Sequence, residues 1–406
     1  KKCDILNEVH QVVSPSGIHA TLSIGIGRDG ANLSEALQFA SLAVEMALSR
    51  GGDQAVIKNK FSFDFIGGKS GEVESSNKVR SRVMANALES LIKDASRVLV
   101  MGHKFSDMDS IGGAVGICSL ARKNGKSALI VADTEKSSAK PLIRLLRESP
   151  EYKEAFISAQ EAIMIADGKT LLVVVDTNRP EQVEDLRLLQ SCNHVAVIDH
   201  HRRAATYIDR ADLSFIEPYA SSVCELMTEI LEMCSDEPKL LRCEAEAIMA
   251  GIVLDTKSFT IRTGDRTFDA AAYLRRAGAD TVAVKKLMQN GMEQTVAKYK
   301  ILQRAQLYRS MAVAVPETPQ NRIVAAQAAD ELLNVAGVDA SMVMYPTEDG
   351  GVFVSARSIG DVNVQLIMEK LGGGGNRAAA AAQINGLTLK QAVEKLYAAI
   401  DEYIDS

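Results

Sequence analysis

Residues 97–110 read RVLVMGHKFSDMDS, a short apolar run followed at once by His103, Asp107 and Asp109. An apolar run of this length is typical of a strand that is buried on both faces of a parallel sheet. The two carboxylates repel one another when they crowd at one strand end without a cation, and the imidazole beside them is a further metal ligand. The stretch therefore predicts an α/β fold with a metal site at the carboxyl edge of its sheet.

Three further apolar runs repeat the pattern: SALIVA at 127–132, TLLVVVD at 170–176 and HVAVID at 194–199. Amphipathic helices are expected around 80–94, 110–124 and 139–148. Strands that are apolar throughout and alternate with such helices indicate a parallel sheet covered on both faces. In sheets of this kind ligands bind beyond the carboxyl ends of the strands.

The fold class is therefore α/β, and the chain divides into several parts. We expect a small α/β piece at 1–60, a linker with a short strand at 61–78, and the parallel-sheet domain at 79–282. A connecting helix at 283–310 then leads to a smaller α/β domain at 311–406. In that last domain strands are expected at 311–315, 321–327, 340–346 and 350–357.

Composition narrows the classes of function. The 406 residues carry a formal net charge of −6, which argues against a surface that coats long nucleic acids, although an anionic small substrate stays open. The six cysteines form no CxxC pair, which argues against a thiolate zinc site. No apolar run approaches the roughly eighteen residues of a membrane span.

Acidic and imidazole groups also end the later apolar runs. Asp176 ends TLLVVVD, Asp199 begins the triplet DHH that continues to His201, and Asp255 ends AGIVLD. A single aspartate at such a place is more often a helix cap or a turn residue. Four such ends in one crevice indicate bound cations. Carboxylates with imidazoles and no thiolate favour Mn²⁺ before Mg²⁺, and their number favours two ions with a bridging aspartate.

These motifs resemble those of the DHH phosphoesterase superfamily, through HKFSDMD at 103–109, Asp176, the DHH triplet at 199–201 and Asp255. The stretches 65–92, 254–280 and 353–375 are similar to the membrane-anchored cyclic di-AMP phosphodiesterases of the GdpP or YybT type. TLSIGIG at 21–27 and AVEMALSRGGDQ at 43–54 look like the carboxyl-terminal part of their degenerate GGDEF domain.

The resemblance implies a partial GGDEF-like domain, a DHH domain and a DHHA1 domain. It implies manganese-dependent hydrolysis of cyclic di-AMP to 5′-pApA, a bacterial homodimer, and a cytoplasm-facing region anchored by an upstream membrane segment. It implies one Mn²⁺ on His103, Asp107 and Asp176. It implies a second Mn²⁺ on Asp109, Asp176, His200 and Asp255. His201 is expected either to support the metal ligands or to face the phosphate. The expected catalytic residues are Asp176, His200 and His201.

The DHHA1 half is expected to bind the substrate. Arg357 is the expected phosphate clamp, because a guanidinium binds two phosphate oxygens at once. The glycines Gly373, Gly374 and Gly375 are expected to bring backbone amides against the phosphate. Asn376 stands where the family usually has histidine, and Arg377 is expected to supply a compensating cation.

Gly112 and Gly113 are expected to let a helix start approach the phosphate. Two alternatives to hydrolysis of the cyclic dinucleotide stay open: hydrolysis of pApA or short oligoribonucleotides, and a nucleotide-sensing module with weak turnover.

Overall fold

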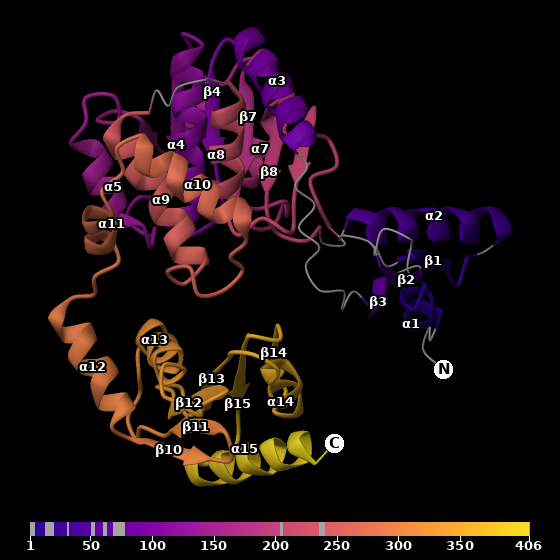
Figure 1. The fold of residues 1–406 in the computed structure, drawn as a ribbon, viewed down its shortest axis with the longest axis vertical. Helices are drawn as coiled ribbons and strands as arrows, with labels where there is room; N and C mark the ends of the chain where they lie inside the picture. Colours follow the sequence, from indigo (N-terminus) through magenta and orange to yellow (C-terminus); the bar gives the residue numbers. More distant parts are fainter. Residues whose placement is uncertain are drawn as a thin grey trace. The chain divides into compact units, whose positions relative to one another are not determined.

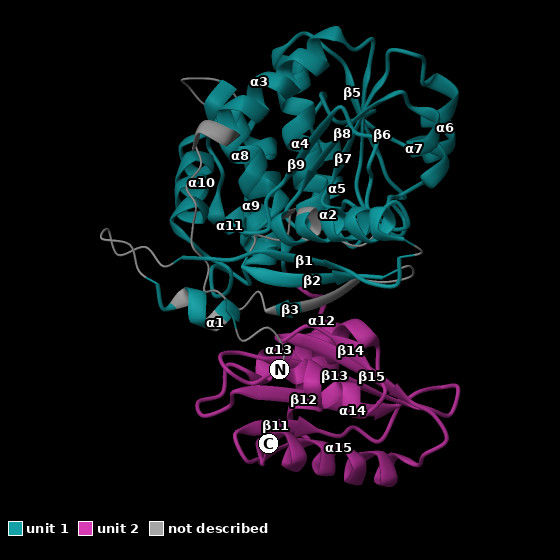
Figure 2. Cartoon of the chain, turned by 90° about the vertical axis from the view of Figure 1, so that its right-hand side faces the viewer, with its two compact units in different colours: residues 1–288 teal, residues 289–406 magenta. Residues whose placement is uncertain are grey.

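A computed structural model describes residues 5–12, 20–30, 32–49, 53–59, 63–67, 78–203, 206–234 and 240–405. The chain forms two compact units, Lys1–Met288 and Gln289–Ser406 (Figure 2). Among the described helices, none is both long enough and apolar enough to cross a membrane.

The amino-terminal part of the first unit is a small α/β piece (Figure 1). Its sheet has the order β1-β2-β3, with β1 and β2 parallel and β3 antiparallel to β2. The sheet packs closely against helix α2: an added Cβ on Gly27 of β1 would be 2.9 Å from the backbone nitrogen of Ala40 in α2. The predicted linker at 61–78 falls partly outside the described residues. The elements are α1 (Ile5–His10), β1 (Ile24–Gly27), α2 (Leu33–Ser49), β2 (Gln54–Lys58) and β3 (Phe63–Gly67).

The larger part of the first unit is built on a six-stranded sheet that is parallel throughout, in the order β6-β5-β4-β7-β8-β9. This confirms the predicted parallel sheet. The strands are β4 (Val98–Met101), β5 (Ala128–Val131), β6 (Phe156–Ile157), β7 (Leu171–Val175), β8 (His194–Asp199) and β9 (Leu213–Ile216). The helices are α3 (Lys78–Asp94), α4 (Met108–Lys123), α5 (Lys140–Arg147), α6 (Ala159–Ile165), α7 (Leu186–Ser191), α8 (Val223–Cys234), α9 (Arg242–Asp255), α10 (Asp265–Arg276) and α11 (Thr281–Leu287).

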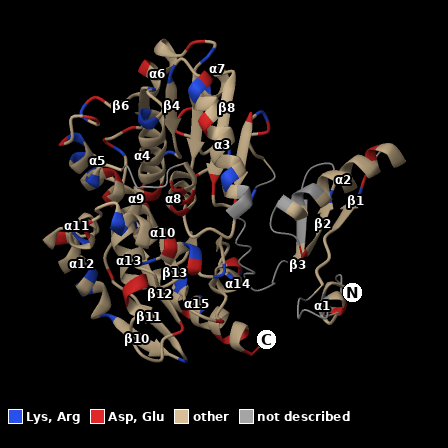
Figure 3. Cartoon of the chain, turned by 45° about the horizontal axis from the view of Figure 1, so that its top comes forward, with Lys and Arg blue, Asp and Glu red and all other residues tan. Residues whose placement is uncertain are grey.

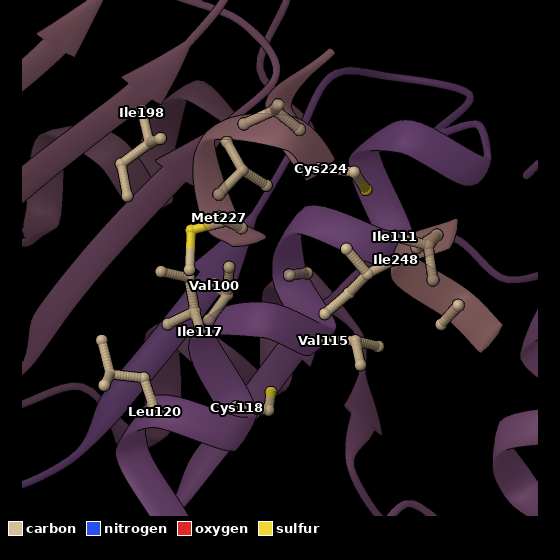
Figure 4. Packing of buried hydrophobic residues seen from close by; sticks show 14 of the residues in the cluster. Val100, Ile111, Val115, Ile117, Cys118, Leu120, Ile198, Cys224, Met227 and Ile248 are labelled. Atoms are coloured by element: carbon tan, nitrogen blue, oxygen red, sulfur yellow. The ribbon is translucent and has the colours of Figure 1, made fainter. Parts of the chain in front are cut away.

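Helices cover both faces of this sheet, because successive strand residues point to opposite sides. Val98 and Val100 of β4 are buried in the cluster formed with α3, α4, α8 and α9, whereas Leu99 and Met101 are buried in the cluster formed with α6 and α7. Figure 4 shows the packing of the first cluster around Val100, Ile117 of α4 and Met227 of α8.

The strand order places a topological switch point between β4 and β7. From β4 the chain proceeds to β5 and β6 on one side, then returns to β7 and continues through β8 to β9 on the other. The loops after β4 and β7 therefore leave the sheet in opposite directions and open a crevice at its carboxyl edge. Both loops carry predicted ligands.

The second unit holds a mixed six-stranded sheet in the order β10-β11-β12-β13-β15-β14. Helices α14 and α15 cover one face, and α12 and α13 cover the other. Its helices are α12 (Met292–Leu302), α13 (Arg322–Leu332), α14 (Val364–Lys370) and α15 (Leu389–Ile404). Its strands are β10 (Ala305–Tyr308), β11 (Met311–Ala314), β12 (Ala340–Pro346), β13 (Val352–Ser358), β14 (Gly374–Gly375) and β15 (Ala379–Ile384).

Two elements differ from the prediction. The strand predicted at 321–327 is helix α13, whose first turn is capped by the Asn321 side chain accepting hydrogen bonds from the amides of Ile323 and Val324. The single connecting helix predicted at 283–310 is also wrong. The structure has α11, then α12 with Gly291 as its N-cap, and then strand β10, because residues from Ala305 onward pair with β11.

Candidate metal centre and active site

The loop after β4 carries the first three predicted ligands. His103 is held by a bridge to Val183, and Asp107 caps α4 by accepting hydrogen bonds from the amides of Asp109 and Ser110, each at 3.0 Å. Asp109 then lies in the first turn of α4 and is fully buried. This N-cap explains the spacing of His103, Asp107 and Asp109. It turns the chain from strand β4 to helix α4 while all three side chains stay at the edge of the sheet.

Asp176 lies at the centre of the cluster. It follows β7 directly, and its φ of 62° is in the left-handed region, which aspartate tolerates better than bulkier residues. Its Oδ2 is 3.3 Å from Nε2 of His103, and its Oδ1 is 3.5 Å from Nε2 of His200. The two oxygens of one carboxylate therefore face two different imidazoles.

His200 follows β8 and is almost completely buried. Its Nε2 lies 3.2 Å from Asp255 and 3.8 Å from Asp109. Both ring nitrogens lack a hydrogen-bond partner among the described residues. A buried imidazole without a partner is costly, so an Nε2 that three carboxylates surround fits a site for a cation.

Asp255 is the last residue of α9. The helix ends there because Lys257, Ser258 and Phe259 all adopt left-handed φ values, between 46° and 63°. Gly251, one turn earlier on the same helix face, packs against α4, where an added Cβ would be 2.8 Å from the Cα of Asp109. This close approach of α9 and α4 brings Asp255 to the cluster.

The clustered charges perturb one another. Burial lowers the pKa of His103 and of His200, but neighbouring carboxylates outweigh it and raise the pKa to about 11 for His103 and to about 10 for His200. Burial and nearby charges raise the pKa of Asp255 to about 6 and that of Asp109 well above its usual range. Burial also acts to raise the pKa of Asp176, but the two imidazoles lower it overall. The carboxylates thus stabilise the protonated form of each imidazole. A divalent cation bound by the same residues would take the place of these protons.

The donor set fits divalent cations. Three groups each place their ligand atoms within 4.8 Å of one another: His103 with Asp107 and Asp176; Asp109 with His200 and Asp255; and Asp176 with His200 and His201. Asp176 belongs to two of these groups and His200 to two. Carboxylate and imidazole donors suit Mn²⁺ or Mg²⁺. All seven sequence-predicted catalytic and metal-binding residues therefore lie in one cluster.

The sequence pattern placed Asp199 in the DHH triplet but assigned it no catalytic or metal-binding role. Its carboxylate is completely buried and accepts hydrogen bonds from Asn178 at 2.5 Å and from Nδ1 of His201 at 2.8 Å. Because Nδ1 is engaged by Asp199, Nε2 of His201 is left for the site cavity. Its position directly before the two histidines was the available signal.

Gly112 and Gly113 do not serve the role expected of them. Both are buried in α4, where added Cβ atoms would lie 2.5 Å from Sγ of Cys224 and 2.7 Å from Cγ1 of Val223, respectively. At Gly112 the added Cβ would also lie 2.7 Å from the backbone oxygen of Ala247 in α9. The missing side chains thus allow α4 to pack against α8 and α9, and this packing accounts for both glycines.

The predicted substrate residues lie in the second unit. Arg357, on β13, faces Asp330 with a 3.4 Å ion pair, and Arg377 pairs with Asp361 at 3.0 Å. Asn376 closes a turn by accepting hydrogen bonds from the amides of Ala378 and Ala379. Their substrate-binding roles stay a prediction.

The glycine run GGGG at 372–375 has several conformational demands. Gly372 and Gly375 have positive φ values of 81° and 151°, and an added Cβ on Gly373 would crowd Ala382. At Gly374 an added Cβ would meet nothing within 4 Å. Its glycine is therefore not required by packing in the second unit, and its role at the phosphate also stays a prediction.

Known protein families match three separate parts of the chain. The family model of the DHH family, N-terminal domain, matches residues 97–252, and that of the DHHA1 domain matches residues 310–406. Residues 97–252 therefore form a DHH domain and residues 310–406 a DHHA1 domain. Residues 1–65 match the GGDEF domain of cyclic-di-AMP phosphodiesterase GdpP-like proteins, so the chain also carries the predicted GGDEF-like segment.

Curated relatives match this chain from end to end. It is 43% identical to the cyclic-di-AMP phosphodiesterase GdpP of Bacillus subtilis, over 100% of this chain and 62% of that protein. It is 41% identical to the cyclic-di-AMP phosphodiesterase PdeA of Listeria monocytogenes, over 99% of this chain and 62% of that protein. The chain thus spans less than two thirds of the length of these relatives.

A solved structure supports the fold. An exopolyphosphatase-related protein from Bacteroides fragilis aligns with a TM-score of 0.65 at 18% sequence identity, over 79% of this chain and 96% of that one. At this identity the likeness concerns the fold alone.

Proposed function

We propose that this protein is a hydrolase that cleaves cyclic di-AMP to 5′-pApA with two bound Mn²⁺ ions. One observation carries the proposal: the two oxygens of Asp176 face different imidazoles, 3.3 Å from His103 and 3.5 Å from His200. This arrangement suits a carboxylate that bridges two ions. The names of the GdpP and PdeA relatives support the cyclic dinucleotide as the substrate.

The residues would divide the work as follows. His103, Asp107 and Asp176 would hold one ion, and Asp109, Asp176, His200 and Asp255 would hold the other. Two bound divalent cations would supply a water of lowered pKa and stabilise the negative charge that develops on the phosphate.

His201 would meet the substrate directly. Its side chain lies at the cavity of about 440 Å³ that also contains His103, Asp107, Asp176 and Asp255. With Nδ1 engaged by Asp199, the Nε2 atom is positioned to hydrogen-bond a phosphate oxygen or the leaving ribose oxygen. Asp199 would fix the orientation of the ring.

The charge distribution argues against a surface that coats long nucleic acids. Acidic and basic residues are interspersed along both units in Figure 3, and the net charge is −6. A homodimer and a cytoplasm-facing position beside a membrane anchor are proposals from the family resemblance.

The test is hydrolysis of cyclic di-AMP by the purified chain with Mn²⁺, with Mg²⁺ and after chelation, beside pApA and cyclic di-GMP. Asp176→Asn is the decisive variant, because asparagine tolerates the left-handed backbone at this position whereas alanine would add strain. Asp185→Asn is the matched control, since Asp185 caps α7 and asparagine caps helices equally well.

We expect manganese-dependent release of pApA that Asp176→Asn abolishes and Asp185→Asn retains. Cleavage of pApA without cleavage of the cyclic substrate would move the function to linear dinucleotides. Binding of Mn²⁺ and cyclic di-AMP without any turnover would leave a sensing module and refute hydrolysis.

A further inference from the structure

Phe105 is an exposed aromatic residue between two predicted ligands. It stands between His103 and Asp107, its side chain is 63% exposed, and its φ is 58°. A bulky residue in the left-handed region costs about 1–2 kcal/mol, and exposure of an aromatic ring to water forgoes its burial energy. Both costs fall on one residue at the edge of the site.

The neighbours of Phe105 prevent the loop from relaxing. The Lys104 amide donates to the carbonyl of Gln182 at 2.8 Å. Ser106 is buried; its carbonyl accepts from the amide of Ser138 at 3.0 Å and its hydroxyl bonds that of Ser137 at 3.2 Å. Because the backbone is held on both sides, the ring is displayed by a fixed loop. Strain of this kind clusters at ligand-binding sites.

The surroundings of the ring limit what it can bind. Phe105 is the one apolar side chain among the residues that line the site cavity, and all the others are charged or polar. A nucleotide whose phosphate binds at the proposed metal ions would have its flat base beside the same cavity. The ligand part that matches an exposed phenyl ring is therefore that base.

We propose that Phe105 is a stacking platform for the nucleobase next to the phosphodiester that is cleaved. This inference rests on the proposed function for the identity of the ligand. A phenyl ring has no hydrogen-bond donor or acceptor, so the platform contributes affinity for any base and does not itself select adenine. Selection among bases must come from other residues.

The first test compares Phe105→Ala with the wild type in Mn²⁺. Stacking on a protein aromatic is worth about 1–3 kcal/mol per base, so the KM for cyclic di-AMP should rise about 5- to 150-fold with little change in kcat. Inhibition by AMP should weaken by a similar factor, whereas inhibition by ribose 5-phosphate, which lacks the base, should be unchanged. Phe105→Tyr should restore the wild-type values.

The second test is independent of turnover. The chain contains no tryptophan, so Phe105→Trp introduces a single fluorophore at the proposed platform. Its emission should change on addition of cyclic di-AMP or AMP with Mn²⁺ and stay constant with ribose 5-phosphate. Tyr299→Trp is the control, because Tyr299 on α12 is similarly exposed, at 53%, and does not line the site cavity.

The outcomes separate the two proposals. An emission change with nucleotide but no hydrolysis by the wild type would refute the proposed function and leave the platform intact. Hydrolysis with unchanged KM in Phe105→Ala would refute the platform alone. An equal emission change with ribose 5-phosphate would also refute it, because the signal would then follow phosphate binding. A lower thermal midpoint for Phe105→Ala would contradict an unpacked, strained ring.

Discussion

Gly251 lies where α9 packs against α4 beside the site. Its replacement by alanine tests whether this packing sets the positions of the proposed metal ligands. An added Cβ would lie 2.8 Å from the Cα of Asp109, and closer still to the sulfur of Cys224. Carbon atoms in ordinary contact are about 3.5–4.0 Å apart. Since the Cα of Asp109 is backbone and cannot rotate away, α9 and α4 must separate by roughly 0.7 Å.

This displacement should harm metal binding more than stability. Overpacking costs about 1–3 kcal/mol, and the higher helix propensity of alanine offsets about 1 kcal/mol of that cost. Ligand distances in metal sites tolerate only about 0.2 Å, and Asp109 and Asp255 lie on the two separating helices. Misplacement of about 1 Å can reduce turnover about 100-fold, and we expect a loss of this order for Gly251→Ala.

The matched control is Gly116→Ala in α4. There the added Cβ would meet the Cβ, Cε and Cγ atoms of Met227 at 3.1–3.3 Å, a smaller overlap than at Gly251 and one that involves no metal-ligand residue. Urea unfolding after chelation, Mn²⁺ titration calorimetry and turnover should be measured for both variants. If Gly251→Ala binds Mn²⁺ and turns over as Gly116→Ala does, the packing of α9 against α4 does not set the site.

Three further predictions concern two buried hydrogen bonds and the effect of Mn²⁺ on stability. Tyr152→Phe removes the 2.6 Å hydrogen bond from the hydroxyl to Glu244, and should lower the free energy of unfolding by about 1.5–3 kcal/mol at neutral pH. Burial raises the pKa of Tyr152 well above its usual value, so as the pH rises the phenol loses its proton in the unfolded state first. This ionisation stabilises the unfolded wild type above a pH of about 10. The difference in free energy of unfolding between wild type and variant, measured with urea, should therefore shrink there. Asp199→Asn should reduce turnover about 10- to 100-fold by releasing the ring of His201, and an unchanged kcat would contradict this. Mn²⁺ at a hundredfold excess over its Kd should raise the free energy of unfolding of the chelated protein by about 2.7 kcal/mol, whereas equal unfolding midpoints with and without Mn²⁺ would exclude a site in the folded state.

The parallel sheet and its cluster of carboxylates and imidazoles could be predicted because each ligand directly follows an apolar run. Asp176 and the DHH triplet end strands β7 and β8, and the strand ends of a parallel sheet meet at one edge. The position of Asp255 was less direct, since it ends a helix. It reaches the cluster only through the close packing at Gly251, which no local pattern reveals.

Other features depend on tertiary contacts. The segment at 321–327 has the β-branched residues of a strand, but its buried residues Val324, Ala325 and Ala328 follow helical spacing against the sheet of the second unit. The glycines of α4 were interpreted as a phosphate approach, whereas α8 packs on them. The left-handed backbone of Phe105 could not be predicted either, because phenylalanine disfavours that conformation.

Hydrogen bonds within the protein orient the carboxylate of Asp109. Its two carboxylate oxygens accept hydrogen bonds from the amides of Val223, at 2.7 Å, and Cys224, at 3.0 Å, at the start of α8. The positive end of a helix dipole stabilises a carboxylate, so this ligand is fixed by protein contacts alone. His200 is buried among carboxylates, with its Nε2 3.2 Å from Asp255 and 3.5 Å from Asp176. A divalent cation bound between them would be held by a carboxylate that the fold orients and by an imidazole that gives up its proton, and it would relieve the repulsion among the carboxylates.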